Sequence, residues 1–335
     1  MIQLAGLGRY LVRRAITFIP TIIGITLLTF TIAFYTPADP ARAWAGGQKA
    51  RPEVVEQVRK MYHLDEPFWT QYYFFMRHIL SGSIYSPVTH NNIIVEWMQG
   101  FIVTANIAVL ATFFTIILGI PLGIIAALRK DTAIDNAVRL LALIGYSTPS
   151  FWIAYIFVWI FYDVLRWITL VGVPIPSRII TGLFVIDAII LGEFNILDAI
   201  VSRLLLPSFI LAFISFGGLA RYVRNTMLDV LSSDYILYAH ARGLPPFRVW
   251  KHALKNSLIP VVTVILFMFA GLLSGAIITE TVFQLPGIGY KYVLAINNFD
   301  IPSIILYTLM TGLFIVITSL LVDILYAIID PRIRL

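Results

Sequence analysis

Long apolar runs dominate this sequence and decide what it can fold into. They occupy 11–35, 102–128, 138–165, 204–228, 258–279 and 304–327. A helical run of about 20 residues matches the hydrocarbon core of a bilayer, and a helix satisfies its own backbone polar groups in lipid. The sequence therefore predicts an all-α polytopic membrane protein, in which 1–335 form a single domain with six transmembrane helices.

The composition agrees with a multi-pass protein of the inner or plasma membrane. Of the residues, 59% are hydrophobic and 13% are charged, whereas a water-soluble domain carries about twice that charged fraction. The first run follows Arg9, Arg13 and Arg14, as in a signal peptide, but it is longer than a signal core and no small-residue cleavage site follows promptly. We expect a retained first span, with a cleaved signal as the alternative.

The distribution of basic residues predicts the orientation. Fourteen of the 24 Lys and Arg residues fall in the start of the chain, the turn after the second run, the 221–255 segment and the tail. Because Lys and Arg are enriched in short cytoplasmic loops, we expect both termini and the 229–257 loop to be cytoplasmic. The same enrichment explains the net charge of +6 without a nucleic-acid partner.

Two segments are expected on the outer side. The 37–101 segment is a large outer loop in which Pro52 suits the first turn of a short amphipathic helix. Its aromatic residues at 68–75 form either an interfacial belt or a docking surface for a partner. The 166–203 segment is broken by Pro and Gly into runs too short to cross a membrane. It is an outer connector or, alternatively, a re-entrant hairpin.

Several kinds of chemistry have no support in the sequence. The chain has no Cys, and its five His residues lie outside the runs without metal-ligand spacing, so no metal site is predicted. It also lacks a G-x-x-x-x-G-K-[ST] phosphate loop. We therefore expect no enzyme activity and no cofactor. An ion-coupled carrier usually places carboxylates near mid-membrane, and no acid occupies the centre of a run.

A basic segment, "DYILYAHARGLPPFRVWKHALKNSLIPVV" at 234–262, interrupts the apolar runs. Asp234 suits the N-cap of a helix over 235–242, and Gly243 suits a left-handed residue that ends it. Pro245 and Pro246 then favour the start of a second helix. The sequence predicts two short helices bent at a glycine.

The second short helix, 247–256, is predicted to place Phe247, Trp250 and Leu254 on one face. One interpretation is an amphipathic helix on the inner leaflet, with its cations on anionic lipid headgroups. The other is an elbow for docking a protein, since small residues let another backbone approach. The candidate contact residues are Ala239, Ala241, Gly243, Pro245, Phe247, Arg248, Trp250 and Lys251.

"YAHARGL" followed by "KHALKNSLIP" resembles the cytoplasmic EAA loop of ABC-transporter permeases of the dipeptide, oligopeptide and nickel class. The generic motif opens Glu-Ala-Ala and has Gly four residues after its second Ala. Here Leu237, Tyr238 and Ala239 precede Gly243, and the Glu is absent. Further stretches resemble the class in the same order: "PADPARAW", "HLDEPFWTQY", "GIPLGIIAALRKDTAID", "STPSFWIAY", "LPSFILAF", "ETVFQLPGIGY" and "LVDILYAIIDPRIRL".

This resemblance implies a permease subunit of a binding-protein-dependent ABC importer. Such a subunit pairs with a second, homologous permease, couples through the elbow to two ATPase subunits that bind ATP and Mg, and receives cargo from an extracytoplasmic substrate-binding protein. The cargo would be di-/oligopeptides or oligosaccharides, with nickel as an alternative. The alternatives outside this class are an ion-coupled secondary carrier and a structural or assembly subunit.

Polar residues within the runs are the candidates for the translocation path. Each of them either lines the path or forms a hydrogen bond between helices. These residues are Asn106, Tyr146, Ser147, Ser150 and Ser274. After the fifth run, "ETVFQLPGIGY" either ends the helix or lies near the docked binding protein, as the resemblance implies.

Overall fold

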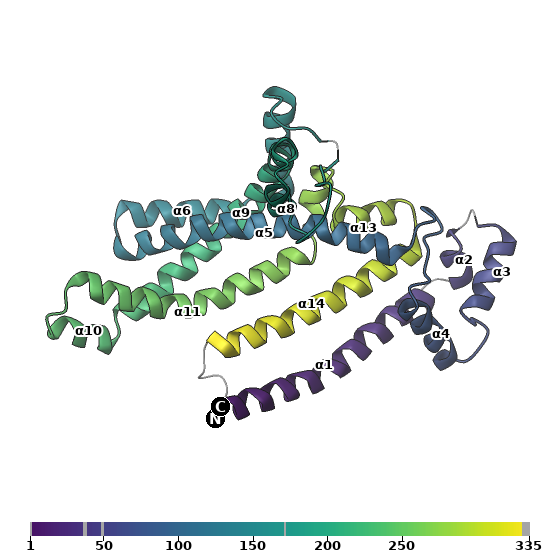
Figure 1. Ribbon diagram of the computed structural model, residues 1–335, viewed down its shortest axis with the longest axis horizontal. Helices are drawn as coiled ribbons and strands as arrows, with labels where there is room; N and C mark the ends of the chain where they lie inside the picture. The colour runs from purple at the N-terminus through teal and green to yellow at the C-terminus, as the bar shows by residue number, and fades with distance from the viewer. Residues whose placement is uncertain (1, 36–38, 48–49, 171, 330–335) are drawn as a thin grey trace.

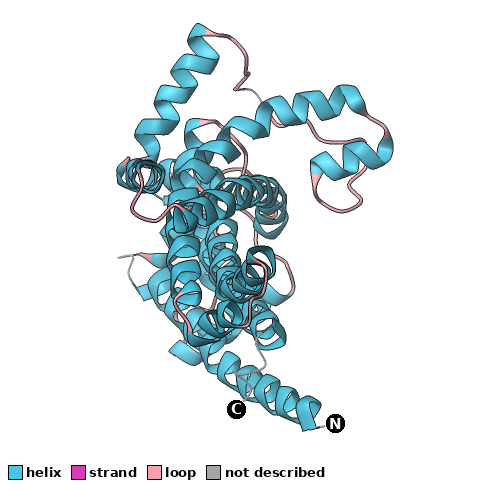
Figure 2. Cartoon of the chain, turned by 90° about the vertical axis from the view of Figure 1, so that its left-hand side faces the viewer, coloured by secondary structure: helices cyan, strands magenta, loops and turns pink. Residues whose placement is uncertain are grey.

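The computed structural model describes residues 2–35, 39–47, 50–170 and 172–329. Within these ranges the regular elements are helices (Figure 2), and an isolated bridge joins Tyr85 to Asn92. The all-α class is therefore confirmed.

Five helices are long and apolar enough to cross a membrane. They are α1 (Ile2–Tyr35), α5 (Ile93–Leu128), α9 (Phe194–Leu231), α11 (Pro246–Leu273) and α14 (Ile301–Ile329). A sixth candidate is a bent pair, in which α6 (Ala133–Ser147) is followed by α7 (Ser150–Val158) and the π-helical segment η2 (Trp159–Val164). The six predicted runs are thus all present as helices.

The third run is not one straight helix as predicted, because it bends by 92° after Ser147. Thr148 has an extended ψ of 128°, which the following Pro149 favours on steric grounds. The Thr148 hydroxyl also donates to Ile144 O at 2.6 Å, which closes the end of α6. Beyond this bend the chain projects from the bundle, near α8 (Phe184–Leu191), as Figure 1 shows.

The order of the helices defines two ends of the bundle. The α5–α6 turn, α10 (Asp234–Ala241) and the end of α14 lie at one end, which we call the α10 end. The opposite α4 end carries α2 (Pro40–Trp44), α3 (Pro52–Met61) and α4 (Phe68–Leu80). Figure 1 shows the two ends at left and right, with α5, α9 and α11 between them.

Glycines set the spacing between the central helices α5 and α9. A Cβ on Gly119 would lie 2.9 Å from Leu219 Cδ2, and a Cβ on Gly123 would lie 2.6 Å from Ala220 O. The small residues of "GIPLG" thus allow α5 and α9 to pack closely. Gly271 of "GLLSG" makes no such contact, since no described atom lies within 4 Å of the position of its Cβ.

The contact between α6 and α9 depends on Gly217, which gives our first prediction. A Cβ at this position would lie 2.5 Å from Ala142 Cα, so Gly217→Ala has to push the two backbones apart. We expect the free energy of unfolding to fall by about 1–3 kcal/mol. The matched control is Gly218→Ala, because the position of its Cβ is open within 4 Å among the described residues. Unfolding of the purified protein in mixed micelles measures both, and equal stability of the two variants would contradict the contact.

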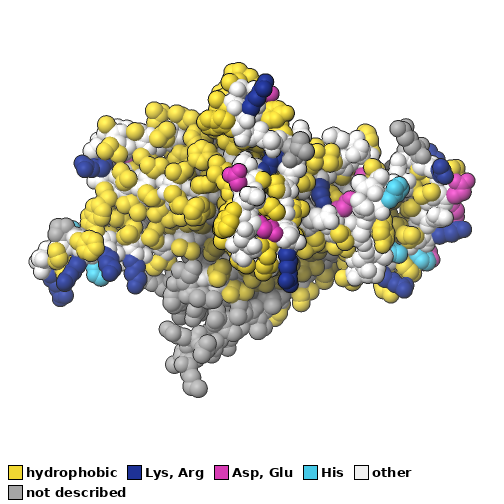
Figure 3. Space-filling view, turned by 45° about the horizontal axis from the view of Figure 1, so that its top comes forward, with side chains coloured by type: hydrophobic (Ala, Val, Ile, Leu, Met, Phe, Trp, Pro, Cys, Tyr) yellow, Lys and Arg dark blue, Asp and Glu magenta, His cyan; other side chains and the backbone are white. Residues whose placement is uncertain are grey.

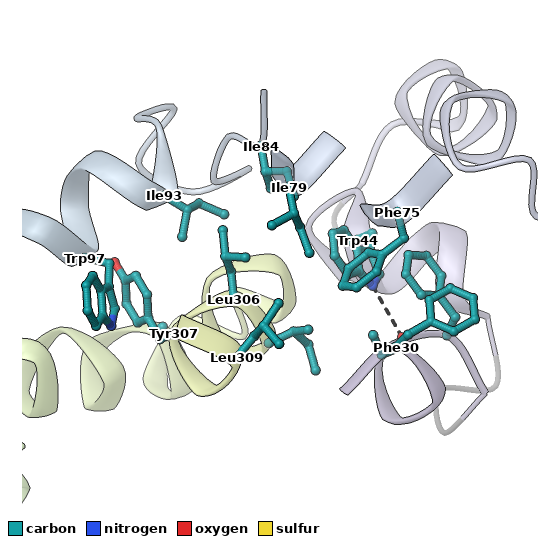
Figure 4. Packing of buried hydrophobic residues seen from close by; sticks show 14 of the residues in the cluster. Phe30, Trp44, Phe75, Ile79, Ile84, Ile93, Trp97, Leu306, Tyr307 and Leu309 are labelled. Atoms are coloured by element: carbon teal, nitrogen blue, oxygen red, sulfur yellow. Dashed lines mark hydrogen bonds between the residues drawn. The ribbon is translucent and has the colours of Figure 1, made fainter. Parts of the chain in front are cut away.

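At the α4 end, the short helices are fixed to the bundle by a buried cluster. Figure 4 shows Phe30 of α1, Trp44 of α2 and Phe75 of α4 packed together, next to Ile93 of α5 and Leu306 of α14. The Trp44 indole also donates to Ala33 O at 3.3 Å. The described part of the 37–101 segment is therefore a folded cap on the bundle.

Candidate functional site

The candidate site is built around the predicted turn at Gly243. α10 begins at Asp234, one residue earlier than predicted. It ends just before Gly243, which adopts a φ of +68°. The Gly243 N–H donates to His240 O at 2.9 Å, and the Leu244 N–H donates to Ala239 O at 3.2 Å. This reciprocal pair is the Schellman motif, in which glycine tolerates the left-handed conformation. The predicted glycine bend is confirmed.

The helix after this turn is longer than predicted. α11 starts at Pro246 and continues through Pro260 to Leu273, so the expected short helix 247–256 is the first part of a spanning helix. Proline within a membrane helix is tolerated where neighbouring groups satisfy the freed carbonyl. The bend at Gly243 therefore connects α10 directly to a helix that crosses the bundle. We call residues 234–255 the elbow.

A small apolar cluster holds the elbow against the bundle. Val249 and Ala253 are buried, and they pack with Ile236 of α10, Met227 of α9 and Ala127 of α5. The Asn256 amide donates to the Tyr235 hydroxyl at 2.8 Å, which ties α11 to α10 a second time. Two helices outside the elbow, α5 and α9, thus contact it, so displacement of the elbow would be transmitted to them and along α11.

Phe247 and Trp250 share one face of the second helix as predicted, and this face is turned outward. Phe247 is 78% exposed and Trp250 is 43% exposed, whereas the buried positions are Val249 and Ala253. The small Ala253 allows the helix to approach α9 closely, and this leaves the aromatic side chains outside. An exposed apolar surface next to cations is typical of a contact site rather than of a core.

The outward side of the elbow combines apolar and basic groups. Leu237 and Tyr238 are 69% and 71% exposed. Figure 3 shows Lys and Arg side chains at the left-hand end, where α10 lies, beside a largely hydrophobic middle. Of the predicted contact residues, Ala239 is half-buried, and the exposed ones are Ala241, Gly243, Pro245, Phe247, Arg248, Trp250 and Lys251.

An ion-pair cluster that the sequence did not reveal lies beside the α5–α6 turn, at the α10 end. Asp135 of α6 is fully buried, and Arg224 of α9 donates to both of its oxygens at 2.7 Å. Arg139 donates to Oδ1 of the same carboxylate at 3.0 Å, and the Asp131 N–H donates to Oδ2 at 3.0 Å. The spacing of Asp135 and Arg139, four residues apart, was the available signal. The cluster joins α6 to α9.

At the α4 end, "ETVFQLPGIGY" folds around a buried carboxylate. Glu280 of α12 (Ile277–Val282) accepts from the Thr104 hydroxyl at 2.8 Å, from Tyr290 N at 3.1 Å and from Ala276 N at 3.2 Å. Burial raises the pKa of Glu280, although these hydrogen bonds oppose the rise. Gly287 is required here, because a Cβ would overlap the Glu280 carboxylate and Thr104. The turn before α13 (Ile288–Asn297) is thus fixed to α5.

Arg203 of α9 joins the outer connector to the same turn. Its buried guanidinium donates from Nε to Gly172 O at 2.7 Å and from Nη2 to Phe283 O at 2.5 Å and Gln284 O at 3.2 Å. Each of these acceptors is a backbone carbonyl. The sequence offered no signal for this clamp, since its acceptors lie 31 or more residues away.

Comparison with known proteins covers almost the whole chain. The family described as "Binding-protein-dependent transport system inner membrane component" matches residues 119–335, and "Binding-prot-dependent transport system membrane comp, N-term" matches residues 7–118. The chain belongs to this family of transport permeases. It is therefore a multi-pass protein of the inner membrane, as its apolar helices indicate.

Individual relatives match this permease end to end. The dipeptide transport system permease protein DppB of Alkalihalophilus pseudofirmus is 38% identical over 97% of this chain and 99% of the relative. DppB of Escherichia coli is 36% identical over 97% of this chain and 98% of the relative. The oligopeptide transport system permease protein AppB of Bacillus subtilis is 32% identical over 98% of this chain and 100% of the relative.

The residues predicted for the path are spread over the permease. Tyr146, Ser147 and Ser150 lie together around the α6–α7 bend, where Tyr146 is 80% exposed. Ser274 ends α11 and donates to Gly271 O at 2.6 Å. Asn106 is buried in α5, on another helix.

Asn106 belongs to a structural contact with the outer connector. Its Nδ2 donates to Ile102 O and Gly182 O, both at 2.8 Å, and its Oδ1 accepts from Phe184 N at 2.7 Å. The next turn is held by Asp187, whose carboxylate accepts from Thr181 N at 2.8 Å. Burial alone would raise the pKa of Asp187, but its hydrogen bonds from Thr181 and neighbouring backbone N–H groups outweigh burial and leave the pKa below its ordinary value.

Proposed function

We propose that this permease is one of two homologous membrane subunits of an ATP-driven importer of di- or oligopeptides, in which it forms half of the translocation pathway. The relatives named above, which carry dipeptide or oligopeptide transport in their names, support this cargo. The observation that carries the proposal is the elbow, whose exposed side is unpartnered among the described residues while its buried side contacts α5 and α9.

The elbow suits the task of coupling to ATPase subunits. ATP and Mg are bound by two partner ATPases, and a substrate-binding protein delivers cargo at the α4 end. Closure of the ATPases favours one arrangement of the permease pair, and the elbow transmits this preference to α5, α9 and α11. Because the Glu of the EAA motif is absent, Phe247, Trp250 and the neighbouring cations supply the contact.

The α6–α7 bend suits the translocation path. Tyr146 and Ser147 are exposed there, and Ser150 is half-exposed. A bend with exposed polar side chains offers hydrogen-bonding groups to a polar cargo where lipid would not. The polar groups of Asn106 and the Ser274 hydroxyl instead bond backbone carbonyls or N–H groups, which fits a role in packing.

The test is co-purification of the tagged permease from its native cells in mild detergent, followed by mass spectrometry. We expect a second permease, ATPase subunits and a binding protein, whose bound ligand names the cargo. Recovery of the chain alone, in a preparation where a known membrane complex survives, would contradict the proposal.

A variant of the elbow sharpens this test. Trp250→Ala is expected to weaken binding of the ATPase subunits about 30-fold, because buried aromatic anchors at interfaces contribute about 2 kcal/mol or more. The matched control is Trp167→Ala, since Trp167 is 68% exposed and lies in the outer connector. ATPase recovery should fall only for the Trp250 variant, while the second permease is retained in both. Equal recovery of ATPase from both variants would locate the ATPase contact elsewhere.

A further inference from the structure

α4 lies beside the transmembrane part of α1 rather than beyond its end. The Tyr72 hydroxyl of α4 is 2.7 Å from the Thr26 hydroxyl, and Phe68 packs edge-on against Phe30 with ring centroids 5.1 Å apart. The spanning part of α1 is Ile16–Tyr35, so Thr26 lies about midway along it. At 1.5 Å per residue, Thr26 is about 14 Å below Tyr35. The Phe68 ring also lies 5.5 Å from the ring of Tyr35, where the span ends, so α4 covers the depth of one lipid leaflet from its edge to the bilayer centre.

One face of α4 presents large apolar side chains at this depth. Phe75 and Ile79 point into the core, whereas Trp69, Tyr73 and Leu80 are 67%, 61% and 81% exposed. These three residues are four and seven apart, so they share one side of the helix. Exposed Trp and Tyr at the edge of a membrane are typical of side chains that meet lipid headgroups.

Next to this apolar face is a basic hollow between α3 and α4. It measures about 410 Å³, and its lining includes Lys60, His63, Arg77, His78 and Ser81. None of the described residues that line it is acidic. The nearby acids are exposed and lie outside the hollow: Glu56 is 3.6 Å from Lys60, and Glu66 is 2.7 Å from His63.

Arg77 connects the basic hollow to the apolar face. It also lines a second hollow of about 440 Å³ with Tyr73, Met76 and Leu80. Its guanidinium has no hydrogen bond or ion pair with any described residue, and it is exposed. A guanidinium pairs with phosphate through two parallel hydrogen bonds. The Arg77 guanidinium thus lies between the basic hollow and the second hollow, which is lined mainly by apolar side chains.

We propose that α4 is an interfacial helix that binds an anionic phospholipid. The phosphate would lie in the basic hollow beside Arg77, and the acyl chains would lie along Trp69, Tyr73 and Leu80. The charge of the hollow matches the phosphate, and the depth of α4 places the apolar face against acyl chains. This inference does not rest on the peptide importer proposed above, because it depends only on membrane insertion.

The test uses the full-length permease with the photo-crosslinker p-benzoylphenylalanine at Tyr73 or, separately, at Leu80. Illumination in native membranes should give phospholipid adducts at both positions. An adduct with a second permease or with the binding protein at these positions would overturn the proposal, because the face would then be a protein interface.

The charge requirement is measured in vesicles of phosphatidylcholine that contain a minor fraction of phosphatidylglycerol. Among the lipid adducts of the crosslinker at position 73, we expect the fraction of phosphatidylglycerol to be about five times its fraction in the vesicle. This is the effect of one basic residue near an anionic headgroup. Arg77→Gln should remove this enrichment. Arg51→Gln, the control, removes another exposed cation of the same loop that does not line the hollow, and it should preserve the enrichment. Adducts that follow the bulk composition in the wild type would overturn the phosphate site.

Discussion

Asp135→Ala is expected to lower the free energy of unfolding of the permease by about 3 kcal/mol, because it leaves Arg224 without its carboxylate partner. The Arg224 side chain is only 12% exposed, and it donates to both Asp135 oxygens at 2.7 Å. Breaking a buried ion pair usually costs about 3–5 kcal/mol of the free energy of unfolding. We expect the lower end of this range, since Arg139 is 46% exposed and stays hydrated. The contact between α6 and α9 at the α10 end should loosen.

Asp131→Asn is the control for this prediction, because Asn tolerates the left-handed φ of +60° at this position. Asp131 is 72% exposed and lies 3.5 Å from the same Arg139, so loss of its charge should change the free energy of unfolding by less than about 1 kcal/mol. Unfolding in mixed micelles, followed by tryptophan fluorescence, compares the two variants. If Asp135→Ala were as stable as Asp131→Asn, the cluster would not hold α6 to α9.

Gly243→Val is expected to abolish peptide uptake while the permease still inserts. The position of the Gly243 Cβ is open within 4 Å among the described residues, so the effect is conformational rather than a clash. A β-branched residue at a φ of +68° is a genuine outlier, and such strain costs about 1–3 kcal/mol. The turn should therefore rearrange, and the angle between α10 and α11 should change.

Gly243→Asn separates this explanation from a general intolerance of side chains at the elbow. Asn adopts the left-handed conformation more readily than other non-glycine residues, so this variant should retain uptake. Measurements of uptake, of ATPase activity in the assembled importer and of permease abundance in the membrane compare the two variants. Normal uptake by Gly243→Val would refute the role of the turn, and loss of uptake by both variants would indicate that the surface, not the backbone, matters.

Features that depend on local sequence were predictable. The apolar runs gave the helices of the bundle, and Gly243 gave the bend, because length and backbone preference are encoded within a few residues. The bend after Ser147 also has a local signal, because Pro149 disfavours a helical conformation at Thr148. The signal was overlooked because the apolar run continues through it.

Features that depend on tertiary contacts were not predictable. Asp135 and Arg224 are 89 residues apart, and Thr104 and Glu280 are 176 apart, so neither pairing leaves a trace in a single sequence. The same limit applies to the buried side of α11, which the sequence did not indicate. Periodicity shows that Phe247 and Trp250 share a side, but only the approach of α9 decides that Val249 and Ala253 are buried instead.

Because α11 continues through Pro260 without a break, it can move as one rigid helix. At 1.5 Å per residue, its 28 residues span roughly 42 Å. One end begins at the Gly243 turn, and the other ends beside Gly275, whose Cβ position is 3.5 Å from Gly289 N in the turn around Glu280. A pivot of about 10° at the elbow would displace the far end by roughly 7 Å, which is more than one helical turn. A small rotation imposed at the α10 end would thus become a large displacement at the far end of α11, beside the turn around Glu280.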